Sequence, residues 1–292
     1  MHIVEEIDHF LKHGWFILNL LDTTPLLEGR LKLQKKLAEF LGGGISLEEY
    51  HIYGEEEAFH NHVQLEMTRF FREERIGPRI LAAQRPFFEK FLGPDLMIQA
   101  NPYLRMTRPQ KPQDNIGYHR DTFYGGSPYE LSVFIPFVEL PQESSLQVLS
   151  GSHIHPADYY PTTQVVNTDP AVTKGSAKHQ LGFLYAPKLM DPSIEEQMRG
   201  ISLKVGQALV FTLSTVHGSI VNRGAVTRWS TDIRIMNALA PVDLSARPDY
   251  YFPFSDSPVT AVAKCFLCSK GKNHEIRDSI ELELCHGQAS KK

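Results

Sequence analysis

Apolar residues recur every three to four positions through much of the first third of the chain, which predicts a mainly helical part over residues 1–95. A Thr-Pro pair opens one expected helix over residues 24–42, and a Gly ends it, as is typical of helix termini. Two further helices are expected between residues 55 and 93, on either side of a Gly-Pro break. The segment HGWFILNLLD, residues 13–22, instead indicates a short strand.

From about residue 96 to 240 the pattern changes to short β-rich runs divided by Pro, Gly and Ser turns. Many short strands after a helical part predict a mainly β fold with helical additions, an antiparallel barrel or jelly roll with the N-terminal helices packed outside it. Within this region, residues 153–200 form a long polar segment that we expect to be a lid or an insertion. Residues 241–292 follow as a C-terminal extension, and we expect one domain over residues 1–292.

The composition narrows the classes of partner. Of 292 residues, 42% are hydrophobic and 22% charged, which is typical of an ordinary globular protein. A formal net charge of -4 gives no basic surface for nucleic acid, and no apolar run is long enough to cross a membrane, so we expect neither partner. Three Cys and an acidic start without a secretory signal favour the cytoplasm, while the oligomeric state cannot be predicted.

The tripeptide His119-Arg120-Asp121 also opens the catalytic loop of protein kinases, so that chemistry needs testing first. A kinase loop carries a metal-binding Asn five residues after its Asp, where this chain has Gly126. The chain also lacks a Gly-rich loop, a Val-Ala-Ile-Lys-like strand and an Asp-Phe-Gly motif. The kinase interpretation is therefore excluded.

Metal binding is the other use of a His-x-Asp pair. Side chains two residues apart in a strand share a face, so His119 and Asp121 are expected to hold one ion while Arg120 points away. His217, at the end of the strand-like segment QALVFTLSTVHGS, would complete a two-His-one-carboxylate set suited to Fe(II) with three open positions. The pair alone is a weak signal in a chain with 13 His, and the ordered combination is what favours a metal site.

The open positions point to a keto acid as co-substrate. 2-Oxoglutarate chelates iron through its 1-carboxylate and 2-keto oxygen, which leaves one position for O2, and its far carboxylate needs a fixed cation. Arg228, eleven residues after His217 on the next expected strand, would supply a bidentate guanidinium. Ser230 faces the same way and is expected to add a hydroxyl bond, and Ser219 is expected to meet the chelating end.

Four segments resemble the phytanoyl-CoA dioxygenase family of iron(II)/2-oxoglutarate oxygenases, over roughly residues 5–240. They are DHFLKHGWFIL, YHRDTFYGG, LSVFIPFVELPQESSLQVLSGSH and VGQALVFTLSTVHGSIVNRGAVTRWS. The resemblance implies a double-stranded β-helix of jelly-roll type. It also implies the following roles: iron ligands His119, Asp121 and His217; 2-oxoglutarate clamp Arg228; secondary contact Ser219.

A further 2-oxoglutarate contact is implied on the strand before the His-x-Asp motif. Gln99, Asn101, Tyr103 and Arg105 are its candidates, and Tyr103 is our choice. The chain departs from the family at Ser150, where the Gly-Ser-His sequence is often preceded by Pro.

By this resemblance the protein is a dioxygenase that uses Fe(II), 2-oxoglutarate and O2 to hydroxylate or otherwise oxidise a C–H bond of a small molecule, releasing succinate and CO2. Asp121 favours hydroxylation over halogenation, because a halogenase leaves the carboxylate position for halide. The polar segment contains five aromatic candidates that either contact a small polar metabolite from biosynthesis or only pack on the barrel: Tyr159, Tyr160, His179, Phe183 and Tyr185. The alternatives are a catalytically silent jelly roll that only binds metal or ligand, and a cupin-type isomerase or metal hydrolase.

Two other groups of residues stay open. Arg105, Arg108 and Lys111 either attract an anionic substrate or are solvated charges. The Cys265-x-x-Cys268 pair, with Cys285 and two His downstream, is either a zinc knuckle or a set of separate thiols.

Overall fold

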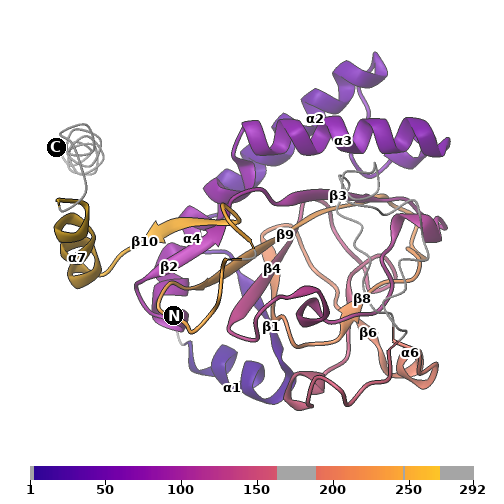
Figure 1. Cartoon of the computed structure of the whole chain (residues 1–292). Coiled ribbons are helices and arrows are strands. Elements are labelled where there is room, and N and C mark those ends of the chain that lie inside the picture. The colour runs from indigo at the N-terminus through magenta and orange to yellow at the C-terminus, as the bar shows by residue number, and fades with distance from the viewer. Residues whose placement is uncertain (1–2, 163–188, 246, 270–292) are drawn as a thin grey trace. The chain divides into compact units, whose positions relative to one another are not determined.

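The computed structural model describes residues 3–162, 189–245 and 247–269 (Figure 1). The chain divides into two compact units, residues 1–254 and 255–292. In the second unit the described residues form helix α7 (Pro258–Ser269), on which Cys265 is an exposed free thiol. Cys285 and its neighbouring His residues, which the zinc hypothesis requires, lie outside the described residues.

The first unit begins with helices, as the apolar spacing predicts. Its described α-helices are α1 (Val4–His13), α2 (Thr24–Leu41), α3 (Glu57–Glu73), α4 (Ile76–Leu92) and α6 (Ser193–Gln197). The helix expected over 24–42 is confirmed: Pro25 lies in the first turn of α2, and Gly42 ends it with a φ of +70°. Between α3 and α4 the backbone turns at Arg75, whose φ is +51°. None of the described helices combines the length and apolar character needed to cross a bilayer.

The described strands form two sheets. The larger sheet contains β1 (Trp15–Asn19), β2 (Leu96–Gln99), β3 (Tyr103–Thr107), β4 (Glu130–Pro136), β7 (Gln207–Thr212), β9 (Arg228–Asn237) and β10 (Tyr251–Ser255) in the order β1-β7-β4-β9-β2-β10, with β3 also paired to β9. The smaller sheet has the order β6-β5-β8, from β5 (Gln147–Val148), β6 (Arg199–Gly200) and β8 (His217–Gly218). Short 3-10 turns lie at η1 (Tyr50–Ile52), η2 (Pro112–Asp114), η3 (Asp121–Tyr124) and η4 (Ser152–Ile154).

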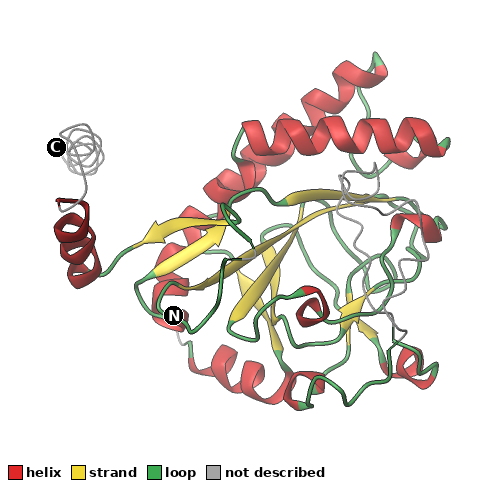
Figure 2. Cartoon of the chain, in the orientation of Figure 1, coloured by secondary structure: helices red, strands yellow, loops and turns green. Residues whose placement is uncertain are grey.

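The fold class expected from the sequence is confirmed: a mainly antiparallel jelly-roll core carries helices on its outside. Helices α2, α3 and α4 contact one another, and α3 and α4 also contact β3, β2 and β9 (Figure 2). The core fills the space between these helices and the larger sheet with fully buried aromatic and aliphatic side chains.

Strand β9 has two buried faces of opposite character. Trp229, Ile233 and Ile235 are fully buried in the apolar core, and the indole Nε1 of Trp229 donates a hydrogen bond to the carbonyl oxygen of Leu47 (2.7 Å). The side chains between them point to the other face, because neighbouring residues in a strand alternate. A row of polar side chains on β9 therefore faces the interior of the jelly roll.

Two glycines let the chain close tightly beside β8. Gly218 has a φ of +144°, and a Cβ added there would lie 2.1 Å from the carbonyl oxygen of Gly117. The Gly117 N–H donates to the carbonyl oxygen of Ser219 (3.1 Å), so the two backbones are in direct contact at this point. No residue with a side chain fits at Gly218 without a backbone shift.

We therefore expect Gly218→Ala to destabilise the protein. The backbone conformation alone would cost about 1–3 kcal/mol of unfolding free energy, and the clash with Gly117 adds to that cost. Urea denaturation measures the change, with Gly43→Ala as the control, because a Cβ at Gly43 meets nothing within 4 Å. Equal denaturation midpoints for the two variants would contradict the expectation.

Candidate metal and anion site

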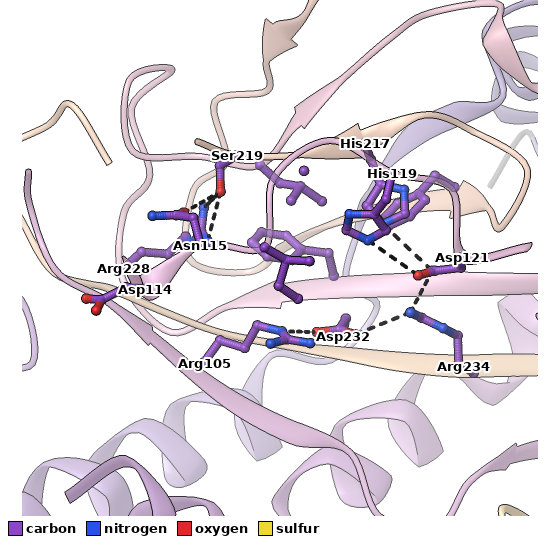
Figure 3. Close-up of a pocket in the computed structure, with 15 residues that line it drawn as sticks. Arg105, Asp114, Asn115, His119, Asp121, His217, Ser219, Arg228, Asp232 and Arg234 are labelled. Atoms are coloured by element: carbon purple, nitrogen blue, oxygen red, sulfur yellow. Dashed lines mark hydrogen bonds and ion pairs between the residues drawn. The ribbon is translucent and has the colours of Figure 1, made fainter. Parts of the chain in front are cut away.

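Three side chains converge at the junction of the two sheets (Figure 3). His119 and His217 form an antiparallel bridge in which each backbone N–H donates to the other residue's carbonyl oxygen at 2.9 Å. Asp121 Oδ1 lies 3.6 Å from His119 Nε2, and Asp121 Oδ2 lies 3.7 Å from His217 Nε2. One ligand atom from each residue lies within 4.8 Å of the others, so the three could hold one metal ion.

The protonation of both imidazoles suits metal binding. His119 Nδ1 is 2.9 Å from the carbonyl oxygen of Gly117, and His217 Nδ1 is 2.9 Å from that of Thr215. A carbonyl oxygen can only accept, so each Nδ1 carries a proton, and in the neutral tautomer this leaves the lone pair on Nε2. Both lone pairs therefore belong to the nitrogen atoms nearest Asp121, as in sites where a backbone carbonyl orients a ligating histidine.

The prediction that His119 and Asp121 lie on one strand is wrong in detail. His119 makes an isolated bridge, and Asp121 begins the 3-10 turn η3, where the Gly126 N–H bonds back to the Asp121 carbonyl oxygen (3.2 Å). Arg120 between them is extended (φ -110°, ψ 141°), which is enough to place its two neighbours on one side. As expected, Arg120 points away, and its guanidinium donates to the carbonyl oxygens of Ser152 and Pro156.

Burial and charge set the ionisation states at this site. Burial opposes ionisation of Asp121, but Arg234 and His217 hold its pKa well below the usual value, so the carboxylate is charged. Burial lowers the pKa of His217 to about 4, against the opposing effect of Asp121, so this imidazole is neutral near pH 7. The site thus offers a carboxylate and a neutral imidazole, which are metal ligands, at neutral pH.

Arg228 lies at the other end of the same pocket and is 4% exposed. Its Nη2 donates to Thr107 Oγ1 (3.0 Å), and both terminal nitrogens lie 3.3 Å from Ser219 Oγ. No carboxylate of a described residue forms an ion pair with it, and its buried Nε has no hydrogen-bond partner among them. Burial, aided by Arg105, lowers its pKa to about 10, so it stays charged. A buried cation without an ion-pair partner is costly, so Arg228 is a candidate for binding an anion.

The serines near Arg228 lie differently from expectation. Ser219 donates to Asn115 Oδ1 (2.6 Å) and accepts from Arg228, so it contacts the guanidinium rather than the three metal-ligand candidates. Ser230 is fully buried, its Oγ has no hydrogen-bond partner among the described residues, and it does not line the pocket. Asn115, which the sequence did not reveal, is thus the residue that fixes the Ser219 hydroxyl.

Our choice of Tyr103 as a further contact finds no support in its position. Its ring lies against the guanidinium of Arg72 (4.5 Å), and it is not among the residues that line the pocket. Arg105, another of the candidates on β3, does line the pocket. Arg105 and Thr107 share a face of β3, and register pairs them with Ser230 and Arg228 of β9.

A row of ion pairs extends along the pocket, and two of its residues, Asp232 and Arg234, were not predicted from the sequence. Arg105 Nε contacts Asp232 Oδ1 (3.1 Å), Asp232 Oδ2 contacts Arg234 Nη1 (3.3 Å), and Arg234 Nη2 contacts Asp121 Oδ2 (2.6 Å). The alternation that relates Arg228 to Ser230 continues to Asp232 and Arg234, so the sequence already indicated that these residues share one face of the strand. The remaining wall is apolar and includes Phe134, Leu146 and Phe211.

Arg108 was expected to attract an anionic substrate or to be a solvated charge, and both interpretations are wrong. It is fully buried, and its Nε and Nη2 donate to the two oxygens of Asp114 (2.9 and 2.8 Å). Its Nη1 donates to the carbonyl oxygens of Gly54 and Glu55. Lys111, by contrast, forms an ion pair with the exposed Glu55 (2.5 Å). Arg108 therefore supports the turn that carries Asp114.

Only the ends of the expected lid, residues 153–200, are described. Residues 163–188, which include the aromatic candidates His179, Phe183 and Tyr185, lie outside the described residues. Tyr160 stacks on the guanidinium of Arg120 (4.8 Å), and Tyr159 stacks on His155 (4.0 Å between ring centroids). Neither tyrosine lines the pocket; Tyr160 packs against a small buried cluster, and Tyr159 is 57% exposed.

We expect Arg108→Met to lower the free energy of unfolding by about 3–5 kcal/mol, because it leaves the buried Asp114 carboxylate without its partner. Chemical denaturation measures this change. Lys111→Met is the matched control and should alter stability little, since its partner Glu55 is largely exposed. A stable Arg108→Met protein that binds substrate more weakly would instead return Arg108 to substrate recognition.

A scan against protein-family models and a search of curated proteins found no match to this chain. Solved structures do match it. One is the apo form of ThoJ, described as a non-heme monooxygenase, at 17% identity over 87% of this chain and 85% of that chain, with a TM-score of 0.55. Another is EvdO2 from Micromonospora carbonacea var. aurantiaca complexed with 2-oxoglutarate, at 16% identity over 84% and 95%, with a TM-score of 0.51. At these identities, what this chain shares with them is the fold.

Proposed function

We propose that this protein is an Fe(II)- and 2-oxoglutarate-dependent dioxygenase that hydroxylates, or otherwise oxidises, a C–H bond of a small polar metabolite. One observation carries the proposal: a buried guanidinium without a carboxylate partner among the described residues shares a pocket with a His-Asp-His set. The pocket thus has two separate places for a ligand that is acidic at one end and chelating at the other.

The residues present fit a ferrous ion. His119, Asp121 and His217 would hold it through two neutral imidazole nitrogens and one carboxylate, the donor set that non-haem Fe(II) oxygenases use. With three protein ligands, the ion would have further coordination positions for a bidentate co-substrate and O2. When bound, the metal with 2-oxoglutarate supplies the oxidising power for the reaction, and the co-substrate becomes succinate and CO2.

Arg228 would bind the outer carboxylate of 2-oxoglutarate. A guanidinium matches a carboxylate with paired donors, and burial strengthens that interaction. Thr107 and Ser219 hold the guanidinium in place, so little rotational freedom is lost when the anion binds. Ser230 could add a bond through its unpartnered hydroxyl only after a side-chain rotation toward the pocket.

The apolar residues of the wall protect the reacting atoms from water. Phe211 packs against the His217 ring (4.5 Å between centroids), and Phe134 and Leu146 line the same pocket. Such a wall lowers the local dielectric and limits side reactions with solvent. Asp121 keeps a carboxylate in the ligand set, which favours hydroxylation or a related oxidation over halogenation.

The structural neighbours support the same activity. ThoJ also has a structure as a nickel complex, which matches this chain at 17% identity with a TM-score of 0.52. EvdO2 binds 2-oxoglutarate in the structure named above. We further propose, on the sequence resemblance, that the chain belongs with the phytanoyl-CoA dioxygenase-like oxygenases and acts on a small molecule in biosynthesis in the cytoplasm.

Purified protein supplied with Fe(II), ascorbate and O2 is expected to convert 2-oxoglutarate to succinate, with faster turnover in the presence of substrate. Asp121→Ala and His119→Ala should each lower succinate formation at least ~100-fold, because each removes a ligand. His62→Ala is the control, since His62 is an exposed histidine on α3. Metal binding without 2-oxoglutarate-dependent O2 consumption would favour the alternative, a catalytically silent binding protein.

Arg228→Met should weaken 2-oxoglutarate binding by roughly 10–100-fold, because it removes charge-assisted hydrogen bonds to the outer carboxylate. Anaerobic calorimetry with Mn(II) in place of iron measures this without turnover. Arg223→Met is the control, since Arg223 lies five residues earlier and its side chain is 63% exposed. If Arg228→Met and the control bind 2-oxoglutarate equally well, the anion site is assigned wrongly.

A further inference from the structure

Arg234 is the most completely bonded side chain near the metal-ligand candidates. Its guanidinium contacts Asp121 Oδ2 (2.6 Å) and Asp232 Oδ2 (3.3 Å), and its Nη1 also donates to Ser132 Oγ. Its backbone N–H donates to Gln99 Oε1 (3.1 Å), which fixes its place on β9. Asp121 and Asp232 raise its pKa although burial opposes the charge, so it is a permanent cation.

Each of the three candidate ligands has one orienting partner. The carbonyl oxygen of Gly117 fixes the His119 ring, and that of Thr215 fixes the His217 ring. Asp121 begins the 3-10 turn η3, which lies outside the two sheets. Arg234 supplies the partner from β9, which pairs with β2, β3 and β4.

The neighbouring charges reduce the repulsion between Arg234 and a divalent metal ion. A guanidinium next to a metal ion repels it, but Asp232 lies against Arg234 on the other side and is shared with Arg105 (3.1 Å). Arg234 can therefore hold Asp121 without adding net positive charge near the ligands, since Asp232 offsets it. Its Nη2 contacts Asp121 while its Nη1 contacts Asp232, so one planar guanidinium spans both carboxylates, which a compact ammonium does less well.

We infer that Arg234 is a positioning residue for the metal site: it orients Asp121 as the two carbonyl oxygens orient the histidines. The inference rests on the proposed metal-binding role of His119, Asp121 and His217. Removing a partner that orients a metal ligand typically costs 10–100-fold in metal affinity, so the effect is measurable in the absence of co-substrate, substrate and turnover.

The test compares Mn(II) affinity, measured by calorimetry without 2-oxoglutarate, in two charge-matched double variants. Arg234→Met with Asp232→Asn removes the partner of Asp121 together with one neighbouring carboxylate. Arg105→Met with Asp232→Asn removes the same net charge from the same row but leaves Arg234 on Asp121. We expect Mn(II) affinity at least ~10-fold weaker in the first than in the second.

A conservative series separates orientation from stability. Arg234→Lys alone leaves the net charge of the row unchanged, as both double variants do, so its Mn(II) affinity should fall between theirs, whatever the order of their melting temperatures. If the Arg234→Met protein does not fold, this Lys variant is compared with Arg105→Lys, and a several-fold weaker affinity is expected.

Equal Mn(II) affinities within either matched pair would overturn the inference while leaving the proposed function in place. A wild-type protein that binds no Mn(II) would instead remove the metal site itself, and the inference with it. The two failures are therefore distinguishable.

Discussion

The mutual backbone hydrogen bonds between His119 and His217 are the interaction on which the site depends. They join the segment before η3 to strand β8, and each is 2.9 Å long. Because the two residues are directly paired, their rings lie on the same side with centroids 4.4 Å apart. The close approach needs Gly218 next to His217, since any Cβ there would meet Gly117. The positions of both imidazoles therefore follow from backbone pairing. The carbonyl oxygens two residues earlier then fix the tautomer of each ring, with the proton on Nδ1.

Burying so many charges requires that they compensate one another. Isolated buried ions cost several kcal/mol each, and breaking one buried pair commonly costs ~3–5 kcal/mol. In this jelly roll the buried charges form a row of alternating sign. Asp232 contacts both Arg105 and Arg234, and Arg234 also contacts Asp121. Arg108 and Asp114 form a separate closed pair. The apolar face of β9, which includes Trp229, Ile233 and Ile235, is buried in the hydrophobic core and supplies stability that these polar groups cannot.

The sequence predicts the jelly roll and the meeting of the metal-ligand candidates with Arg228 from the ordered spacing of these residues on β-rich segments, although Asp121 lies on η3 and not on a strand. The period-two alternation on β9 contains Asp232 and Arg234, but their importance depends on partners from β3 and η3, which only the fold brings near. For Arg108 the sequence suggested a contact with a ligand, and the structure shows a structural role instead. A charged residue near a motif suggests a ligand contact, whereas its actual partners, Asp114 and the backbone around Gly54, come from chain packing that local sequence does not reveal.

The charge balance of the described pocket also bears on which keto acid fits it. Apart from the Arg108–Asp114 pair, Arg105, Arg228 and Arg234 face Asp121 and Asp232, so one positive charge remains. That charge lies at Arg228, which has no ion-pair partner among these residues and sits at the opposite end of the pocket from the metal-ligand candidates (Figure 3). A keto monoacid would satisfy the metal end alone and leave the buried guanidinium unpaired. A keto diacid would satisfy both ends, so under the proposed function the unpaired cation would select for a second carboxylate.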